Sequence, residues 1–201
     1  MPSTPTRPSC CYMFHRNAGI QEVSVTMSTL GEPHPSNREE QSKNAALTHV
    51  NERGEAKMVN VGGKETTNRT ATACSLISMS KSAGEAIRSN TLKKGDCVSV
   101  ARIAAIQAAK QTSALIPLCH LILIDSVDVA HSWVSETELK WVVTVTSTGS
   151  TGVEMEALTA ASVAALAVYD MCKAIDRSMI ISQVMLLAKS GGSRGDFQRS
   201  E

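Results

Sequence analysis

The stretch that decides the fold runs from residue 122 to residue 174 and reads ILIDSVDVAHSWVSETELKWVVTVTSTGSTGVEMEALTAASVAALAVYDMCKA. Residues 122–130 and 139–147 are rich in β-branched and aromatic side chains and are separated by a short polar turn, which predicts a β-hairpin. Residues 148–152 break this pattern with two glycines. From 153 to 174 the apolar residues recur at helical spacing, which predicts one long helix after the hairpin.

A strand and two helices are expected before the hairpin. Residues 70–79 alternate between two faces as a strand does, and 82–89 are typical of a short helix. Asp96 is a suitable N-cap for an Ala-rich helix over 97–112. Two further strands are expected at residues 57–61 and 179–188.

The order of these elements predicts the fold class. From residue 70 it is strand, helices, strand, strand, helix, strand. This order is typical of an α+β, ferredoxin-like (split βαβ) fold, in which an antiparallel sheet carries its helices packed on one face.

Residues 1–45 differ in composition from the rest of the chain. They are rich in Ser, Thr, Pro, Asn and charge, so we expect a disordered N-terminal extension, with one domain over 46–201. Arg7 and Arg16 lie in a first stretch of 21 residues that has no acidic residue, which suits an organelle transit peptide. A plain variable extension fits this composition equally well.

Charge and cysteine usage exclude several classes of protein. The chain has 20 Lys plus Arg against 19 Asp plus Glu, which argues against general nucleic-acid binding or a polybasic membrane attachment. No apolar run approaches the roughly 20 residues of a membrane span, so none is expected. Because no cysteine pair has the C-x2-C spacing of zinc sites, we expect no metal and six free thiols. They are Cys10, Cys11, Cys74, Cys97, Cys119 and Cys172.

Three short segments could bind an anion or a substrate, and each also has a plainer interpretation. Residues 93–96 (KKGD) form a basic turn at a helix start, although such turns are often merely solvated. His120 follows Pro117 in a loop and is either a binding residue or a packing residue. Residues 189–195 (KSGGSRG) combine cations with glycines, which favours an anion site or a flexible tail.

The long helix carries Glu156 near its start and Asp170 and Lys173 near its end. These three side chains fall within roughly 100° of one helix face, but Glu156 and Asp170 are about 21 Å apart along the axis. The two ends therefore serve different purposes, or one end meets the opposite end of a second subunit. Asp170 and Lys173 are either a surface ion pair or an acid beside a lysine whose pKa is lowered by burial.

Seven segments together carry a resemblance to a known family. They are LTHV (47–50), MVNV (58–61), LKKGD (92–96), ARIAAIQAAK (101–110), LIPLCH (115–120), TGVEMEALTAASVAALAVYDMCKA (151–174) and LLAKSGG (186–192). Over nearly the whole chain after the extension, this string closely resembles the cyclic pyranopterin monophosphate synthases of the molybdenum cofactor biosynthesis protein C family.

The resemblance implies a phosphorus–oxygen lyase of molybdenum cofactor biosynthesis. Its substrate would be the cyclic dihydroguanosine triphosphate made by a radical-SAM GTP cyclase, and its products cyclic pyranopterin monophosphate and diphosphate. It further implies a homohexamer built as a trimer of dimers, with the pocket between subunits. No cofactor is expected, with Mg²⁺ an open question for the triphosphate, and neither nucleic acid nor membrane is an expected partner. A mitochondrial matrix location follows if the extension is a transit peptide, and a cytoplasmic one if it is not.

The same resemblance implies roles for individual residues. Asp170, Lys173 and Lys94 match the family's catalytic positions. The implied substrate-binding residues are Leu118, Cys119, His120, Met155, Glu156, Lys64, Arg69, Lys110 and Lys189.

The sequence departs from the family pattern at several positions. Asn60 stands where many members have Asp, Leu121 where Pro is common, Ser150 where many have Lys, and Ser193-Arg194 where Lys-Ser is common. If these departures disabled the pocket, the chain would be a catalytically impaired, oligomeric nucleotide- or pterin-binding paralogue. A generic ferredoxin-like interaction module is a second alternative, and the retained site residues argue against both.

Overall fold

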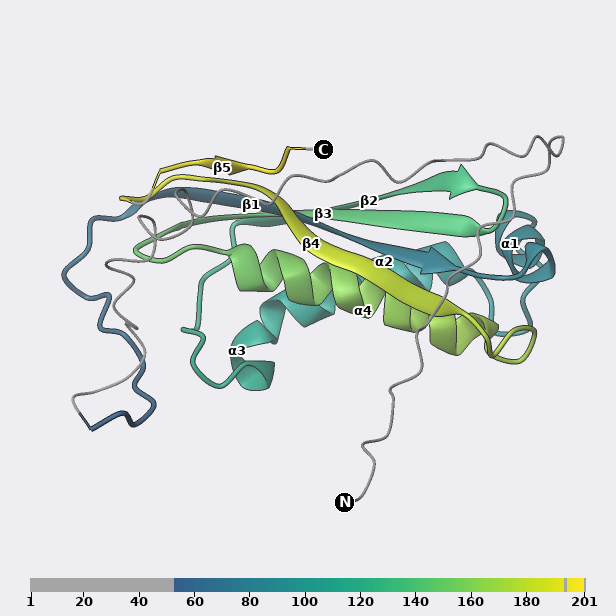
Figure 1. The fold of residues 1–201 in the computed structure, drawn as a ribbon, viewed down its shortest axis with the longest axis horizontal. Helices are drawn as coiled ribbons and strands as arrows, with labels where there is room; N and C mark the ends of the chain where they lie inside the picture. The colour runs from purple at the N-terminus through teal and green to yellow at the C-terminus, as the bar shows by residue number, and fades with distance from the viewer. Residues whose placement is uncertain (1–52, 194, 201) are drawn as a thin grey trace, which may run out of the picture. The chain divides into compact units, whose positions relative to one another are not determined.

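The computed structural model describes residues 53–193 and 195–200. The expected extension over residues 1–45 and the LTHV segment lie outside the described residues. The elements, drawn in Figure 1, are β1 (Thr67–Ser78), α1 (Lys81–Arg88), α2 (Cys97–Lys110), α3 (Thr112–Leu115), β2 (Ser126–Ser135), β3 (Glu138–Gly149), α4 (Glu154–Cys172), β4 (Ile180–Ser190) and β5 (Phe197–Gln198).

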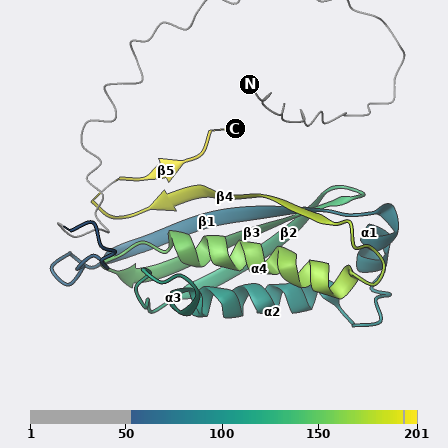
Figure 2. The same cartoon turned by 60° about the horizontal axis from the view of Figure 1, so that its bottom comes forward.

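The five strands form one sheet in the order β2-β3-β1-β4-β5. Every neighbouring pair is antiparallel, with β1 between β3 and β4. Helices α2 and α4 lie side by side on one face of this sheet, and α1 lies at one of its ends (Figure 2). The arrangement confirms the predicted α+β, ferredoxin-like fold.

One predicted strand is absent from the described residues, and two predicted boundaries differ from the structure. The described residues 57–61 form no strand; this segment precedes a turn in which the Gly62 amide donates to Asn60 Oδ1 at 2.9 Å. Strand β2 begins at Ser126 rather than at 122, because the preceding residues belong to the loop that leaves α3. The helix predicted over 97–112 is divided at Gln111, where the backbone leaves helical geometry (φ −105°, ψ 6°).

The core lies between β1 and α4. One face of β1 contributes Ala71, Ala73, Ser75 and Ile77, each with no exposed surface. Helix α4 presents a row of equally buried small residues to the sheet and α2: Ala157, Ala160, Ala161, Ala164 and Ala165. Such small side chains let the helix backbone approach its neighbours closely, and the Ser75 hydroxyl donates to the Ala161 carbonyl at 2.6 Å.

Helix α4 is more apolar than the sequence analysis recognised. With 19 residues and a mean hydropathy of 1.3, it could cross a membrane by length and composition alone, contrary to the expectation that no such segment exists. Half of it is nevertheless buried against the sheet and α2. This burial is typical of the core helix of a globular domain.

The cysteine thiols of the described chain are free, as predicted, at Cys74, Cys97, Cys119 and Cys172. Cys97, at the start of α2, donates a hydrogen bond to the Cys172 sulfur at the end of α4, which lowers the Cys172 pKa. The two helices therefore run antiparallel. Cys10 and Cys11 lie outside the described residues.

Candidate active site

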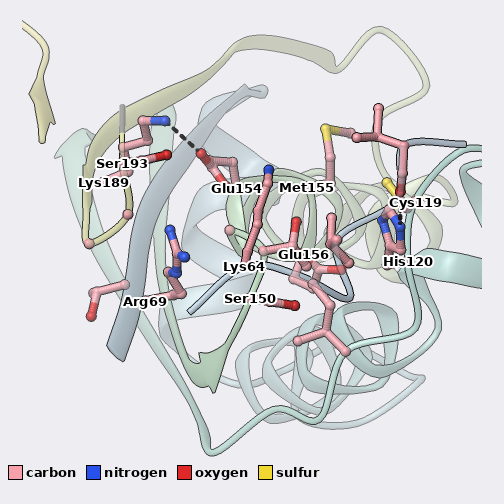
Figure 3. A pocket seen from close by; sticks show the side chains of 18 of the residues that line it. Lys64, Arg69, Cys119, His120, Ser150, Glu154, Met155, Glu156, Lys189 and Ser193 are labelled. Atoms are coloured by element: carbon pink, nitrogen blue, oxygen red, sulfur yellow. Dashed lines mark hydrogen bonds and ion pairs between the residues drawn. The ribbon is translucent and has the colours of Figure 1, made fainter. Parts of the chain in front are cut away.

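A cavity of about 330 Å³ opens at the N-terminal end of α4. Four segments that are distant in sequence form its walls (Figure 3). They are the chain from Val59 to Thr70, the loop from Leu118 to Ile122, the turn from Ser150 to Glu156, and the end of β4 from Lys189 to Ser193. The ferredoxin-like topology brings these segments together because the β3–α4 turn and the end of β4 flank β1.

Eight of the nine residues expected to bind substrate line this cavity. They are Lys64, Arg69, Leu118, Cys119, His120, Met155, Glu156 and Lys189. Lys110 is the exception, because it is an exposed residue at the last position of α2 and does not line the cavity.

His120 and Cys119 face the cavity from the loop after α3. The His120 Nε2 atom lies 2.8 Å from the Val59 carbonyl oxygen. A carbonyl only accepts, so Nε2 is the donor in this hydrogen bond. Burial, and then the negative charge of Glu156, raise the pKa of the Cys119 thiol, so it stays protonated and can donate a hydrogen bond.

Glu156 is the most deeply buried acid of the cavity, with 3% of its surface exposed. Burial raises the pKa of this carboxyl, and the negative charge of Glu154 raises it further, while a bond from its own backbone N–H acts in the opposite direction. A carboxyl with a raised pKa is suited to exchange protons with a substrate near neutral pH.

Glycines bring the end of β4 close to the start of β1. Gly191 has φ +84°, and a Cβ there would collide with the Asn68 carbonyl oxygen. At Gly192, which has φ +96°, an added Cβ would collide with the guanidinium of Arg69. The Arg69 Nε donates to the Gly149 carbonyl at 3.2 Å, which fixes this cation at the cavity wall.

The sequence analysis did not assign Glu154 to the site. Its Oε1 lies 2.9 Å from Lys189 Nζ, and both side chains are largely buried, with 30% and 26% exposed. The feature of the sequence that could have identified Glu154 was its place in the first turn of α4, two residues before Glu156. The partner, 35 residues away near the end of β4, could be found only from the sheet register.

The three residues expected to be catalytic form a second cluster at the other end of α4. Lys94 Nζ lies 2.7 Å from Asp170 Oδ2, and Lys173 Nζ lies 2.8 Å from Asp170 Oδ1. The bond from Lys173, and then the bond from Lys94, lower the pKa of Asp170 to about 2. Asp170 is therefore ionised and lies between two ammonium groups.

Lys173 differs from one expectation of the sequence analysis. Its side chain is 53% exposed, and the bond to Asp170 raises its pKa. The interpretation in which burial lowers the pKa of this lysine is therefore wrong for the single chain. The exposed ion pair was the alternative, and the structure has it.

One chain does not bring the cavity and the second cluster together. Glu156 and Asp170 are 14 positions apart on a continuous helix, which corresponds to about 21 Å along its axis. Among residues 53–193 and 195–200, no group of three His, Cys, Asp or Glu side chains could hold a metal ion.

Comparison with known proteins assigns the chain to a family. The MoaC family model matches residues 58–192, which is more than half of the chain. This range includes the cavity residues Glu156 and Lys189 as well as Asp170 with its two lysines. The chain belongs to the MoaC family. This membership confirms the resemblance found in the sequence.

Several bacterial relatives share half of their residues with this MoaC chain. The protein of Peptoclostridium acidaminophilum is 51% identical over 153 residues, covering 76% of this chain and 97% of the relative. Those of Bacillus licheniformis and Bacillus cereus are each 51% identical over 159 residues, covering 77% and 78% of this chain and 94% and 99% of the relative. Each is named cyclic pyranopterin monophosphate synthase.

The departures from the MoaC pattern lie in and around the cavity. Ser150 and Ser193 line it, so the position where the family resemblance leads us to expect a lysine lies in the cavity wall. Asn60 lies in the turn before β1, where its amide oxygen accepts a hydrogen bond from the Gly62 N–H. Leu121 is 81% exposed on the loop next to His120, and Arg194 lies outside the described residues.

Proposed function

We propose that this protein is a cyclic pyranopterin monophosphate synthase that converts cyclic dihydroguanosine triphosphate into cyclic pyranopterin monophosphate and diphosphate. It would act in molybdenum cofactor biosynthesis as a phosphorus–oxygen lyase and take its substrate from a radical-SAM GTP cyclase. One observation supports this most: the cavity gathers eight residues expected from the family in a chain 51% identical to proteins of that name.

The cations of the cavity suit the triphosphate. Lys64, Arg69 and Lys189 line the wall formed by β1 and the end of β4. A triphosphate carries several negative charges, and these accumulate on diphosphate as it leaves. Cations fixed before the reaction lower the free energy of that transition state without reorganising.

Proton transfers need groups that hold and accept protons beside the ring. In our proposal these are Asp170, Lys94 and Lys173, assisted by Glu156 in the cavity. Asp170 enters ionised and the two lysines enter protonated, as their ion pairs favour. Substrate binding would have to break these pairs before either lysine could donate its proton.

The separation of the two clusters supports a site shared between subunits. A small substrate cannot contact both ends of α4, whereas two chains related by a two-fold axis can bring opposite ends together. We place the reaction at such an interface in a homohexamer built as a trimer of dimers.

Mixing inactive variants tests the shared site. His120→Ala and Lys173→Ala chains, inactive alone, would be unfolded and refolded together. With a shared site, random mixing restores about a quarter of the activity, because half of the dimers are mixed and each has one intact site. If each chain holds a complete site, mixing restores nothing.

The activity itself is tested by incubating the purified protein with the cyclic triphosphate, with and without Mg²⁺. We expect diphosphate release and, after oxidation, pterin fluorescence, and Lys173→Ala should abolish both with folding intact. Lys81→Ala is the matched control, since Lys81, on α1, forms an exposed pair with Glu136 of the β2–β3 turn. Near-normal turnover by Lys173→Ala would refute the assignment. A well-folded protein that binds the triphosphate but makes no product would be the impaired paralogue.

The cellular location depends on residues 1–45. The bacterial relatives match only 76–78% of this chain, and they favour a cytoplasmic protein. The composition of the first 21 residues supports the alternative, a transit peptide leading to the mitochondrial matrix. A fusion of residues 1–45 to a fluorescent protein distinguishes the two, because only a transit peptide directs it to mitochondria.

A further inference from the structure

The cavity expected to bind phosphates contains a carboxylate in contact with one of its own cations. Glu154 Oε1 lies 2.9 Å from Lys189 Nζ inside the wall where phosphate oxygens would be received (Figure 3). With side chains only 30% and 26% exposed, this pair is less screened by water than the exposed pairs of Asp170. An incoming anion must compete with Glu154 for Lys189.

The Glu154 carboxylate lies against the backbone of the turn that precedes α4. A Cβ added at Gly152 would lie 2.7 Å from the Glu154 carboxyl carbon, so the carboxylate rests directly against the glycine. Glu154 is also the first residue of α4, where the helix dipole favours a negative charge. The carboxylate is therefore an anion at the N-terminal end of a helix and beside a lysine.

The charge of Glu154 also acts on its neighbours in the cavity. It is one of the causes that raise the pKa of Glu156. A carboxylate whose field reaches Glu156 also repels any phosphate that enters the same space.

We propose that Glu154 is a resident counter-ion, which pairs with Lys189 in the empty cavity and yields this lysine only to a ligand that makes further cation contacts. A single phosphate that takes Lys189 loses about as much from the broken pair as it gains. A diphosphate group that also reaches Lys64 and Arg69 gains enough to displace Glu154. The pair therefore sets a threshold that a diphosphate passes and a single phosphate does not, and the identity of the natural ligand rests on the proposed function.

Calorimetric titration of the full-length protein with inorganic diphosphate and inorganic phosphate tests the inference. Glu154→Gln keeps the shape of the side chain and removes the charge. We expect it to bind diphosphate at least about threefold more tightly, and to bind phosphate more tightly by a similar factor, because both ligands break the same pair. Phosphate binding should therefore become measurable, while the ratio of the two affinities stays about the same.

The pairing with Lys189 is tested by repeating the substitution in a Lys189→Met background. There the gain from Glu154→Gln should largely disappear, since no lysine is left to release. An equal gain in both backgrounds would mean a general charge effect and would overturn the pairing. Unchanged or weaker binding by Glu154→Gln would mean that Glu154 merely positions Lys189, and wild-type protein that binds no diphosphate would also refute the inference.

Two measurements keep the result interpretable. Thermal unfolding of each variant shows whether it folds. If Glu154→Gln does not fold, Glu154→Asp replaces it, because this variant keeps the charge but shortens the side chain. Glu154→Asp should release Lys189 only in part and give an intermediate affinity. Diphosphate binding needs no turnover, so a protein that shows the expected affinities but converts no cyclic triphosphate would contradict the proposed function alone.

Discussion

Replacement of Ser75 by alanine tests how α4 is held on the sheet. Ser75 lies in the middle of β1 with no exposed surface, and its hydroxyl donates to the Ala161 carbonyl in the middle of α4 at 2.6 Å. This side-chain bond joins the strand to the helix that carries residues of both clusters.

The expected loss follows from what the substitution leaves behind. Ser75→Ala removes the donor, while the Ala161 carbonyl keeps its bond within the helix, so no buried acceptor is left without a partner. The free energy of unfolding should therefore fall by about 1 kcal/mol, the net value of one hydrogen bond. For a chain of this size that lowers Tm by about 2–4 °C.

Urea and thermal unfolding followed by circular dichroism, at one fixed protein concentration, measure this loss. Ser162→Ala is the matched control, because the Ser162 hydroxyl donates to Leu158 within α4 itself, at 2.8 Å. That bond is local, so its loss should cost under about 0.5 kcal/mol. A Ser75→Ala variant no less stable than Ser162→Ala would refute the idea that this bond secures α4.

Three further predictions concern charge and backbone geometry. The pKa of Asp170 is lowered from 3.8 to about 2, so its ion pairs stabilise the fold at neutral pH and this contribution is lost as the pH falls through that range. An NMR titration should show that Lys94→Met moves the Asp170 midpoint upward, and an unmoved midpoint would contradict the pair. Gly191→Ala should lower the free energy of unfolding by more than about 1 kcal/mol in urea, because its φ is +84° and its Cβ meets β1. The control Gly195→Ala, with φ +73° and nothing within 4 Å of its Cβ, should lose less, and equal losses would exclude the collision. Because the pKa of Glu156 is raised by burial, its stabilising contribution is present at low pH and is lost as the pH rises through the folded pKa. Glu156→Gln should therefore unfold at a higher temperature than wild type in mildly alkaline buffer but not in acid, and a difference independent of pH would disprove this.

The fold was largely predictable because its main elements are long and periodic. The hairpin of β2 and β3 and the helix α4 have apolar spacings that few other structures share. Residues 57–61 have a similar alternation, yet this segment forms no strand in the described chain, and its Val59 and Val61 line the cavity instead. A pattern of five residues cannot distinguish a strand from a loop that packs apolar side chains.

The site was predictable in composition and only partly in geometry. The family resemblance named most of the cavity residues, whereas the residues alone indicated the loop of His120, the start of the long helix and the basic, glycine-rich segment 189–195. They could not show that Glu154 meets Lys189, since that contact depends on how the end of β4 aligns with the start of α4. They also suggested a buried Lys173, because the spacing of apolar residues does not reveal that the helix end is exposed.

The core, the cavity and the Asp170 cluster all depend on α4, and this limits where the chain can gain or lose residues. A residue inserted within the helix would turn everything beyond it by about 100° and move it by about 1.5 Å. The Ala-rich face would then leave the sheet, and Asp170 would point away from Lys94. Deletions and insertions in natural variants should therefore fall in loops such as the one between α3 and β2, while α4 keeps its length of 19 residues. The length of α4 thus fixes the separation between Glu156 and Asp170. Alignment of further family members can check that this length does not change.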